Sequence, residues 1–196
     1  MNQTDDLERF AALLKKWNAA QNLVSRETLG TDLWPRHIND SLQLTKFMRP
    51  TDALVVDLGS GGGFPAIPLA IASRGQDRRF ILLEPATKKA VFLRTVAREL
   101  ALPVTVETIR TTDFDSRETA DLITSRALAA LPVLLQDSCR FLSPKGHMLL
   151  HKGRNYRQEL DDAAALFDFD VVVHTSESDA GGVILEIANL TAKSVA

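Results

Sequence analysis

Three alternating glycines follow an apolar segment and an acid: the chain reads Asp57, Gly59, Gly61 and Gly63 within Asp-Leu-Gly-Ser-Gly-Gly-Gly-Phe. Glycines at the end of a buried strand let the backbone turn tightly and let a ligand approach closely, because no Cβ stands in the way. A turn that merely joins a strand to a helix is the alternative, but four glycines in five positions exceed what such a turn needs. The loop therefore predicts a bound cofactor of the nucleotide type.

The residues that flank these glycines indicate which cofactor to expect. A dinucleotide-binding loop, Gly-x-Gly-x-x-Gly, would need glycine at position 64, where the chain has Phe64. The carboxylate of Asp57 would repel a pyrophosphate, whereas it could neutralise the ammonium group of S-adenosylmethionine. The pattern resembles the first motif of class I methyltransferases, and it disfavours a nicotinamide-dependent oxidoreductase.

Further candidate residues stand where predicted strands end. Glu84 lies 25 residues after Gly59, where a carboxylate can accept hydrogen bonds from both ribose hydroxyls; a charge at the start of a helix is the alternative. Thr111 and Thr112 are expected near the adenine, with a helix cap as the other interpretation. Arg126 ends the fourth apolar run, where a cation could hold a substrate phosphate or a base edge, unless it is a solvated surface arginine.

The elements that must position these residues alternate along the chain. Apolar residues at helical spacing predict two helices, over residues 5–20 and 30–47. Strand-like runs follow at 53–58, 80–84, 104–108, 121–125, 147–151, 170–174 and 183–189. Helical patterns separate them at 65–74, 88–100, 131–142 and 156–167. We predict an α/β fold: a class I methyltransferase Rossmann-like sheet of about seven strands, mostly parallel with a C-terminal antiparallel hairpin, preceded by N-terminal helices.

Length and composition fit one folded unit. The chain has 196 residues, of which 45% are hydrophobic, so we predict a single methyltransferase domain over 1–196 in which 1–50 form an N-terminal helical extension. The one cysteine, Cys139, has no partners at metal-ligand spacing, so we expect a buried structural thiol and no metal site.

Charge and hydropathy indicate where the protein is located and what it can bind. No apolar run approaches a membrane span, and the acidic N-terminus differs from a secretory signal, so we expect a soluble, cytoplasmic protein without membrane contact. We also expect a monomer. The net charge is −2 and the pI is near 6.1, so any contact with RNA must come from local basic clusters.

Several other segments accompany the glycine loop. They are Trp17-Asn18, Asn22-Leu23, Arg-His-Ile-Asn-Asp-Ser-Leu at 36–42, Gly-Phe-Pro-Ala-Ile-Pro at 63–68, Lys88-Lys89 with Phe92-Leu93, Thr-Ser-Arg-Ala at 124–127, and Lys152-Gly153. Together they resemble the methyltransferase G family of small-subunit ribosomal RNA, formerly called glucose-inhibited division protein B. The resemblance implies a bacterial enzyme that transfers a methyl group from S-adenosylmethionine to N7 of guanine 527 in 16S rRNA. Its partner would be the 16S rRNA or the assembled small ribosomal subunit.

The resemblance also assigns roles to single residues. It implies that Gly59 and Phe64 lie at the cofactor, that Thr111 and Thr112 lie beside the adenine, and that Arg126 lies at the mouth of the site, where it binds both cofactor and substrate. The family usually has Arg-Ala-Glu where this chain has Arg-Thr-Thr-Asp at 110–113. A contact from the backbone would survive that change, whereas one that needs glutamate would not.

The reaction that the resemblance implies needs few catalytic groups from the protein. Guanine N7 has a free lone pair and no proton, so its attack on the sulfonium methyl needs no general base, and positioning should supply most of the rate. We expect Arg126 to be the catalytic residue, as a positioning group at O6 or a phosphate. Arg36, Lys88, Lys89 and Lys152 are expected to bind substrate, with a solvated basic surface as the alternative.

Weak global charge leads us to expect that folded rRNA or a pre-assembled subunit is needed, and that naked RNA is a poor substrate.

Two other functions remain open from the sequence. One is a methyltransferase that acts on another RNA or a small molecule, and the other is an RNA-binding or subunit-binding module without transfer activity. Intact Asp57, Gly59 and Glu84 favour a working cofactor pocket over the second.

Overall fold

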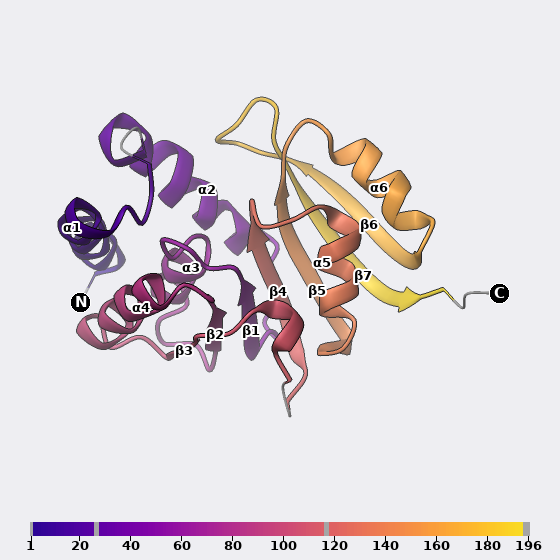
Figure 1. The fold of residues 1–196 in the computed structure, drawn as a ribbon, viewed down its shortest axis with the longest axis horizontal. Coiled ribbons are helices and arrows are strands. Elements are labelled where there is room, and N and C mark those ends of the chain that lie inside the picture. Colours follow the sequence, from indigo (N-terminus) through magenta and orange to yellow (C-terminus); the bar gives the residue numbers. More distant parts are fainter. Residues whose placement is uncertain (1, 26–27, 116–117, 194–196) are drawn as a thin grey trace.

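A computed structural model describes residues 2–25, 28–115 and 118–193 (Figure 1). Within these residues, seven strands form one sheet in the order β3-β2-β1-β4-β5-β7-β6. The strands are β1 (Leu54–Leu58), β2 (Arg79–Leu83), β3 (Val104–Glu107), β4 (Ala120–Arg126), β5 (Leu142–Lys152), β6 (Phe167–Thr175) and β7 (Val183–Ala192). Strands β1 to β5 pair in parallel, and β7 runs antiparallel to both of its neighbours, β5 and β6. This arrangement confirms the predicted sheet and its C-terminal hairpin.

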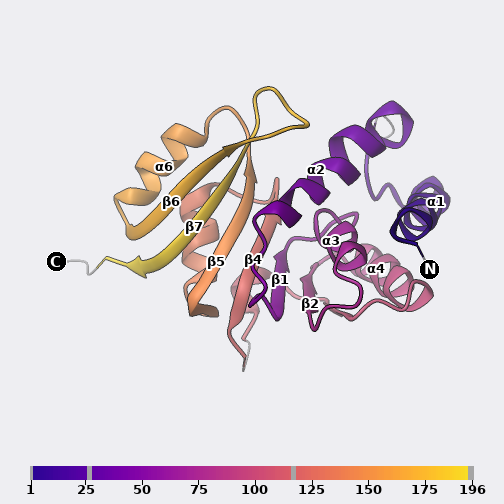
Figure 2. The same cartoon turned by 180° about the vertical axis from the view of Figure 1, so that it is seen from behind.

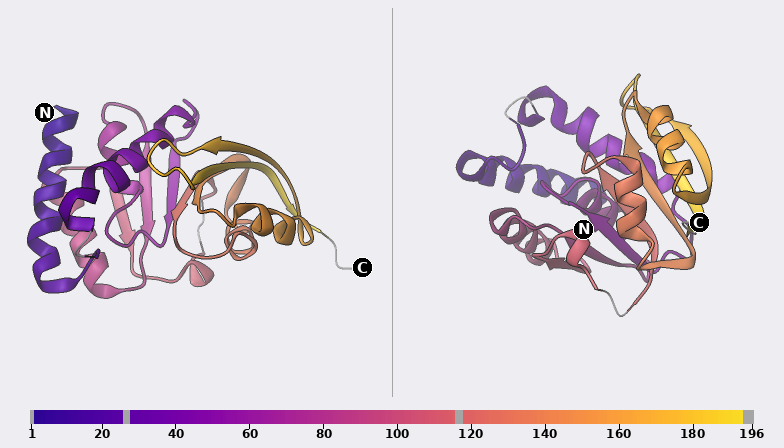
Figure 3. Two further views of the ribbon diagram at one scale, coloured as in Figure 1. Left: turned by 90° about the horizontal axis from the view of Figure 1, so that it is seen from above. Right: turned by 45° about the vertical axis from the view of Figure 1, so that its right-hand side comes forward.

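Helices precede the sheet and connect its strands. Before β1 come α1 (Gln3–Gln21), η1 (Thr28–Ile38), α2 (Asn39–Leu42) and η2 (Gln43–Lys46). The connections contain α3 (Ala66–Ala72), α4 (Thr87–Glu99), η3 (Thr111–Asp113), α5 (Leu131–Ser138) and α6 (Tyr156–Ala164). Figures 2 and 3 show α1 at the end of the molecule far from the β6–β7 hairpin. No helix among the described residues is long and apolar enough to span a membrane.

The alternation of side chains along the strands gives the sheet two buried faces. On one face, Val55, Phe80 and Leu82 pack with the apolar side of α1, α3 and α4. On the other, Val56 and Ile123 pack with α5 and α6. Because both faces are covered, the central strand β1 is buried along its whole length.

Three helix boundaries differ from the prediction. The helix expected over 30–47 is a series of short pieces, because Gly30 has non-helical torsions and Pro35 provides no backbone donor. The helix expected over 131–142 ends at Ser138, and the one expected over 156–167 ends at Ala164. In both cases the last apolar residue of the expected helix, Leu142 or Phe167, begins the next strand, which helical spacing alone does not distinguish.

Strand β5 also begins earlier than expected. It starts at Leu142, where the sequence Ser-Pro-Lys-Gly at 143–146 has the composition of a turn. The pairing register with β4 shifts between Ala120 and Leu122, which pair with Leu142 and His147, so the polar segment forms an irregularity inside the strand. The carboxyl end of β5 nevertheless lies beside that of β4, where the candidate residues gather.

Candidate active site

The glycine loop after β1 needs glycine for its backbone and for its contacts. Gly59, Gly61 and Gly63 have φ values of +66°, +54° and +96°, in the left-handed region that favours glycine. A Cβ at Gly59 would lie 2.5 Å from Leu128 Cδ1, and a Cβ at Gly63 would lie 2.8 Å from Ile67 Cγ1. The loop thus has the tight, closely packed turn that its sequence indicates, and its role in cofactor binding stays a prediction.

Glu84, directly after β2, holds this loop in place. Its side chain is almost wholly buried, and its two carboxylate oxygens accept hydrogen bonds from the backbone N–H groups of Gly61 and Ala86, each at 2.8 Å. A carboxylate has about four acceptor positions, so two remain for other donors. The expected contact of Glu84 with ribose hydroxyls would have to use these, and it stays a prediction.

Asp57 lies beneath the loop, not on its surface. The side chain is fully buried, and Oδ1 accepts a hydrogen bond of 2.7 Å from Thr124 Oγ1. Burial is the main cause that raises the pKa of Asp57 to about 7; hydrogen bonds from Ser60 and Thr124 oppose this shift, and the nearby carboxylate of Glu84 adds to it. Its Oδ2 is buried without a hydrogen-bond partner. A ligand ammonium could pair with this oxygen only by reaching below the loop surface.

A cavity of about 290 Å³ opens beside the loop. Its lining consists of Gly59, Pro85, Arg110, Thr111, Thr112, Leu128, Ala129 and Asp137. The structure therefore brings Thr111 and Thr112, which follow β3, together with Gly59, which follows β1, as expected. Arg140 Nη2 donates to the carbonyl oxygens of both threonines, at 3.0 Å each, and so fixes η3 against the cavity. We call this cavity the loop pocket.

Phe64 is not among the residues that line the loop pocket, and its expected position at the cofactor stays a prediction. Its ring is 8% exposed and packs beneath the N-terminal helices, 5.4 Å from the ring of Phe10 and 5.2 Å from that of His37. Burial, reinforced by the charge of Arg126, lowers the pKa of His37 to about 4, so this contact involves a neutral imidazole near pH 7. Phe64 therefore anchors the loop to the N-terminal helices.

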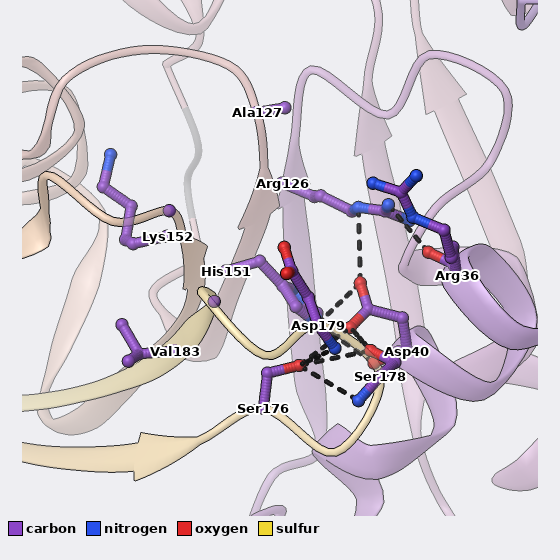
Figure 4. A pocket seen from close by; sticks show the side chains of 12 residues that line it. Arg36, Asp40, Arg126, Ala127, His151, Lys152, Ser176, Ser178, Asp179 and Val183 are labelled. Carbon is purple, nitrogen blue, oxygen red and sulfur yellow. Dashed lines mark hydrogen bonds and ion pairs between the residues drawn. The ribbon is translucent and has the colours of Figure 1, made fainter.

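A second cavity, of about 200 Å³, lies at the carboxyl ends of β4 and β5 (Figure 4). We call it the polar pocket. Its lining consists of Arg36, Asp40, Arg126, Ala127, His151, Lys152, Gly153, Ser176, Ser178, Asp179, Gly182 and Val183. Residues 126–129 separate it from the loop pocket, since Arg126 and Ala127 line one and Leu128 and Ala129 line the other. A cofactor and a substrate could thus meet across this short segment.

Arg126 lies partly buried in the polar pocket, with one nitrogen left over. Its Nε is 3.4 Å from Asp40 Oδ2, and its Nη2 donates to the carbonyl oxygen of Arg36 at 2.8 Å. Its Nη1 is buried and has no hydrogen-bond partner. Burial lowers the pKa of Arg126, but a guanidinium begins far above neutrality and keeps its charge. The pocket therefore contains a cation with an unused donor.

Asp40 organises the side chains around this cation. Its Oδ1 accepts hydrogen bonds from Gln43 Nε2 at 2.6 Å and from the hydroxyl of Ser178. Its Oδ2 lies 3.4 Å from His151 Nε2 as well as from Arg126 Nε. Asp40 thus ties the loop between β6 and β7, residues 176–182, to the helices that precede the sheet.

Lys152 is committed to internal contacts. Its Nζ lies 2.5 Å from Glu159 Oε2 and donates to the carbonyl oxygen of Ala129 at 2.8 Å, and its side chain is only 7% exposed. In Figure 4 it points away from Arg126. This ammonium is therefore already paired within the protein, and its expected contact with substrate stays a prediction. Its geometry is that of a brace for the segment between the two pockets.

The other predicted substrate contacts differ in their positions. Arg36 lies at the mouth of the polar pocket, 57% exposed, with Nη1 3.2 Å from Asp32 Oδ2. Lys88 and Lys89 lie in the first turn of α4 and line neither pocket. Their expected contacts with RNA stay predictions. Among the described residues, no group of three or more His, Cys, Asp or Glu side chains could hold a metal ion.

A family model described as rRNA small subunit methyltransferase G matches residues 3–186. The chain belongs to this family. The ribosomal RNA small subunit methyltransferase G of Bartonella tribocorum is 44% identical over 189 residues, covering 95% of this chain and 87% of that protein. The protein of that name from Sinorhizobium medicae is 41% identical over 192 residues, covering 95% and 89%. The resemblance inferred from the motifs is thereby confirmed.

Solved structures show the same fold at low identity. The chain matches ribosomal protein L11 methylase from Lactobacillus delbrueckii subsp. bulgaricus with a TM-score of 0.62 and 15% identity, covering 81% of this chain and 79% of that one. It matches TYW2 from M. jannaschii, solved in complex with AdoMet, with a TM-score of 0.58 and 15% identity, covering 80% and 76%. These likenesses identify the fold as that of class I methyltransferases.

Two residues of this methyltransferase G family member were missed in the sequence. Asp40 is inside the segment 36–42 that carries the family resemblance, and His151 stands at the carboxyl end of a predicted strand. The rule that ligands bind at strand ends could have selected His151. Nothing local to the sequence indicates that Asp40 meets Ser178, because 138 residues separate them.

Proposed function

We propose that this protein transfers the methyl group of S-adenosylmethionine to N7 of a guanine in 16S ribosomal RNA, the guanine 527 that the family resemblance implies. Its membership of the rRNA small subunit methyltransferase G family supports the class of reaction and of substrate. The observation that carries the choice of guanine is Arg126, a cation at the end of β4 that lines the polar pocket and whose Nη1 is buried without a partner. Arginine is the side chain that most commonly reads guanine.

The loop pocket fits S-adenosylmethionine. The left-handed turn at Gly59 and Gly61 lets a ligand approach the backbone, and Thr111 and Thr112 supply backbone groups on the opposite wall. Beneath the loop, the unpartnered Oδ2 of Asp57 suits a ligand ammonium. These residues would hold the cofactor, which when bound supplies an electrophilic methyl group on a positively charged sulfur.

The polar pocket would hold the base. Arg126 donates to guanine O6 and fixes the plane of the ring, so that the neighbouring N7 faces residues 126–129 and the loop pocket beyond them. No side chain needs to remove a proton, because N7 carries none. Asp40 stabilises the guanidinium, and Lys152 holds the carbonyl of Ala129 in place. The protein thus contributes position and exclusion of water, and we propose that Arg36, Lys88 and Lys89 contact the surrounding RNA.

Replacement of Arg126 tests the proposal. Small subunits that lack the methyl group are incubated with labelled cofactor, and the modified nucleoside is identified by mass spectrometry. Arg126→Ala should lower kcat/KM roughly 100-fold, as loss of one preorganised donor does. Calorimetry should also show weaker cofactor binding, because the resemblance places Arg126 at the cofactor as well as at the substrate. Arg79→Ala, an exposed arginine at the amino end of β2, is the control and should retain full activity.

Three results would contradict this proposal. Full transfer by Arg126→Ala would remove Arg126 from the reaction. A wild-type product other than 7-methylguanosine would overturn the choice of atom while leaving a methyltransferase of another specificity. Binding of the subunit without any transfer by the wild-type protein would indicate a non-catalytic module.

A further inference from the structure

The polar pocket contains a second unsatisfied group besides Arg126. Buried polar atoms in folded proteins nearly always have a hydrogen-bond partner, so each exception needs an explanation. Among the described residues, six buried side-chain atoms have none: Gln21 Oε1, Asp57 Oδ2, Arg126 Nη1, Ser138 Oγ, His147 Nδ1 and His151 Nδ1. Arg126 and His151 both line the polar pocket. Two unused groups in one cavity point to a ligand.

The neighbours of His151 determine which of its nitrogens carries the proton. Its Nε2 lies 3.0 Å from the carbonyl oxygen of Asp40 and 3.4 Å from Asp40 Oδ2. Both atoms can only accept, so Nε2 must donate. Burial, together with the charge of Arg126, lowers the pKa of His151, so the ring is neutral near pH 7. A neutral ring protonated at Nε2 leaves Nδ1 as an acceptor.

Arg126 and His151 stand side by side. They are register partners where β4 and β5 pair in parallel, so their side chains leave neighbouring positions at the same edge of the sheet. Together they offer one donor, Arg126 Nη1, and one acceptor, His151 Nδ1, from adjacent positions of the two strands. Guanine presents the complementary pair, with O6 as an acceptor beside the N1–H donor. Adenine presents the reverse order, with the 6-amino donor beside an N1 acceptor.

We propose that His151 determines the base specificity of this enzyme by accepting the N1–H of the target guanine while Arg126 donates to O6. This inference rests on the function proposed above, and it adds His151 as the residue that recognises N1–H of the base. Both protein atoms are closed off from water in this structure, with Ser178 and Asp179 of the loop 176–182 lining the same pocket. A base that turns out of its stack into the pocket would displace this loop.

Two substitutions separate base reading from a structural role. In His151→Asn, the amide oxygen takes the place of Nδ1 and keeps the acceptor, but the donor to Asp40 is lost. In His151→Gln, the amide nitrogen takes the place of Nε2 and keeps the donor to Asp40, but the acceptor is lost. The reading role predicts near-wild-type kcat/KM for Asn and a loss of about ten-fold or more for Gln. A role confined to holding Asp40 predicts the opposite order.

The assay uses unmethylated small subunits with guanine or adenine at the target position, and calorimetry with S-adenosylmethionine shows that each variant is folded. His174→Gln, on β6, is the matched control and should behave as wild type. The inference is overturned if His151→Gln retains wild-type kcat/KM, if Asn loses more than Gln, or if wild type methylates the adenine target equally well. A wild-type product other than 7-methylguanosine would instead overturn the proposed function.

Discussion

Alanine substitutions in the glycine loop should destabilise the protein to different extents. The size of each loss depends on the φ angle of the glycine and on the atoms that the new Cβ would contact. At Gly61, φ is +54° and the nearest atom to an added Cβ is 3.8 Å away, so only the left-handed strain of about 1–2 kcal/mol applies. At Gly63, φ is +96° and the Cβ would lie 2.8 Å from Ile67 Cγ1 and 3.3 Å from Leu93 and Phe10. Those side chains are buried, so overpacking adds about 1–3 kcal/mol. We expect losses of about 1–2 kcal/mol for Gly61→Ala and about 2–5 for Gly63→Ala.

Gly59→Ala should separate stability from cofactor binding. The new Cβ would lie 2.5 Å from Leu128 Cδ1, but Leu128 is half exposed and its side chain can turn aside. The loss of stability should therefore stay near the strain value of about 1–2 kcal/mol. Leu128 also lines the loop pocket, so its displacement should weaken cofactor affinity.

Equilibrium unfolding in urea measures these losses, and calorimetry measures cofactor affinity. Gly75→Ala is the control for strain alone, because φ there is +80°, nothing lies within 4 Å of the added Cβ, and the residue lines neither pocket. Subtracting its loss from that of Gly63→Ala gives the contribution of the contacts. If Gly63→Ala lost no more than Gly61→Ala or Gly75→Ala, the packing that we describe beneath the loop would be wrong.

Two further predictions concern buried charges. Asp57 has a pKa near 7 instead of 3.8, so the folded protein holds its proton more tightly than the unfolded chain, and roughly 4 kcal/mol of stability present below pH 4 should be lost by pH 8. Urea unfolding between pH 4 and pH 8 should show wild type losing roughly 4 kcal/mol relative to Asp57→Asn, whose amide does not titrate; a difference that stays constant over this range would contradict the assignment. Arg78 is buried and donates to the carbonyls of Asp52 and Arg49, so Arg78→Gln should cost about 3 kcal/mol or more. The adjacent Arg79 is exposed, so Arg79→Gln should not change stability measurably, and equal losses would refute the distinction.

The fold could be predicted because its signals are local. Strand-helix alternation, and a connection between the last two strands too short for a helix, gave the parallel sheet and its hairpin. The position of Thr111 and Thr112 near Gly59 was predictable as well, because strands that pair in parallel bring their carboxyl ends to one edge of the sheet. The predicted start of β5 was less accurate. The polar segment Ser-Pro-Lys-Gly at 143–146 belongs to this strand, but as an irregularity in its pairing with β4, which the sequence of the segment does not indicate.

The site could be predicted in its location but not in its partners. Phe64 follows the last glycine of the loop, yet it turns toward Phe10 and His37, because the N-terminal helices cover that side. The contact between Asp40 and the β6–β7 loop likewise joins segments far apart in the sequence. Spacing within a segment carries no information about such packing.

The contrast between Arg126 and Lys152 shows why partners decide function at this edge. Both are cations at the ends of neighbouring strands, and both were expected to contact substrate. The first turn of α6 brings Glu159 to Lys152, whose charge is then compensated inside the protein. Arg126 meets Asp40 through Nε but keeps Nη1 without a partner. A buried group whose hydrogen bonds are complete stabilises the fold, whereas one with a donor left over has more to gain from a ligand. Because the chain is acidic overall, base recognition by this protein should depend on a few such unsatisfied atoms more than on its total charge.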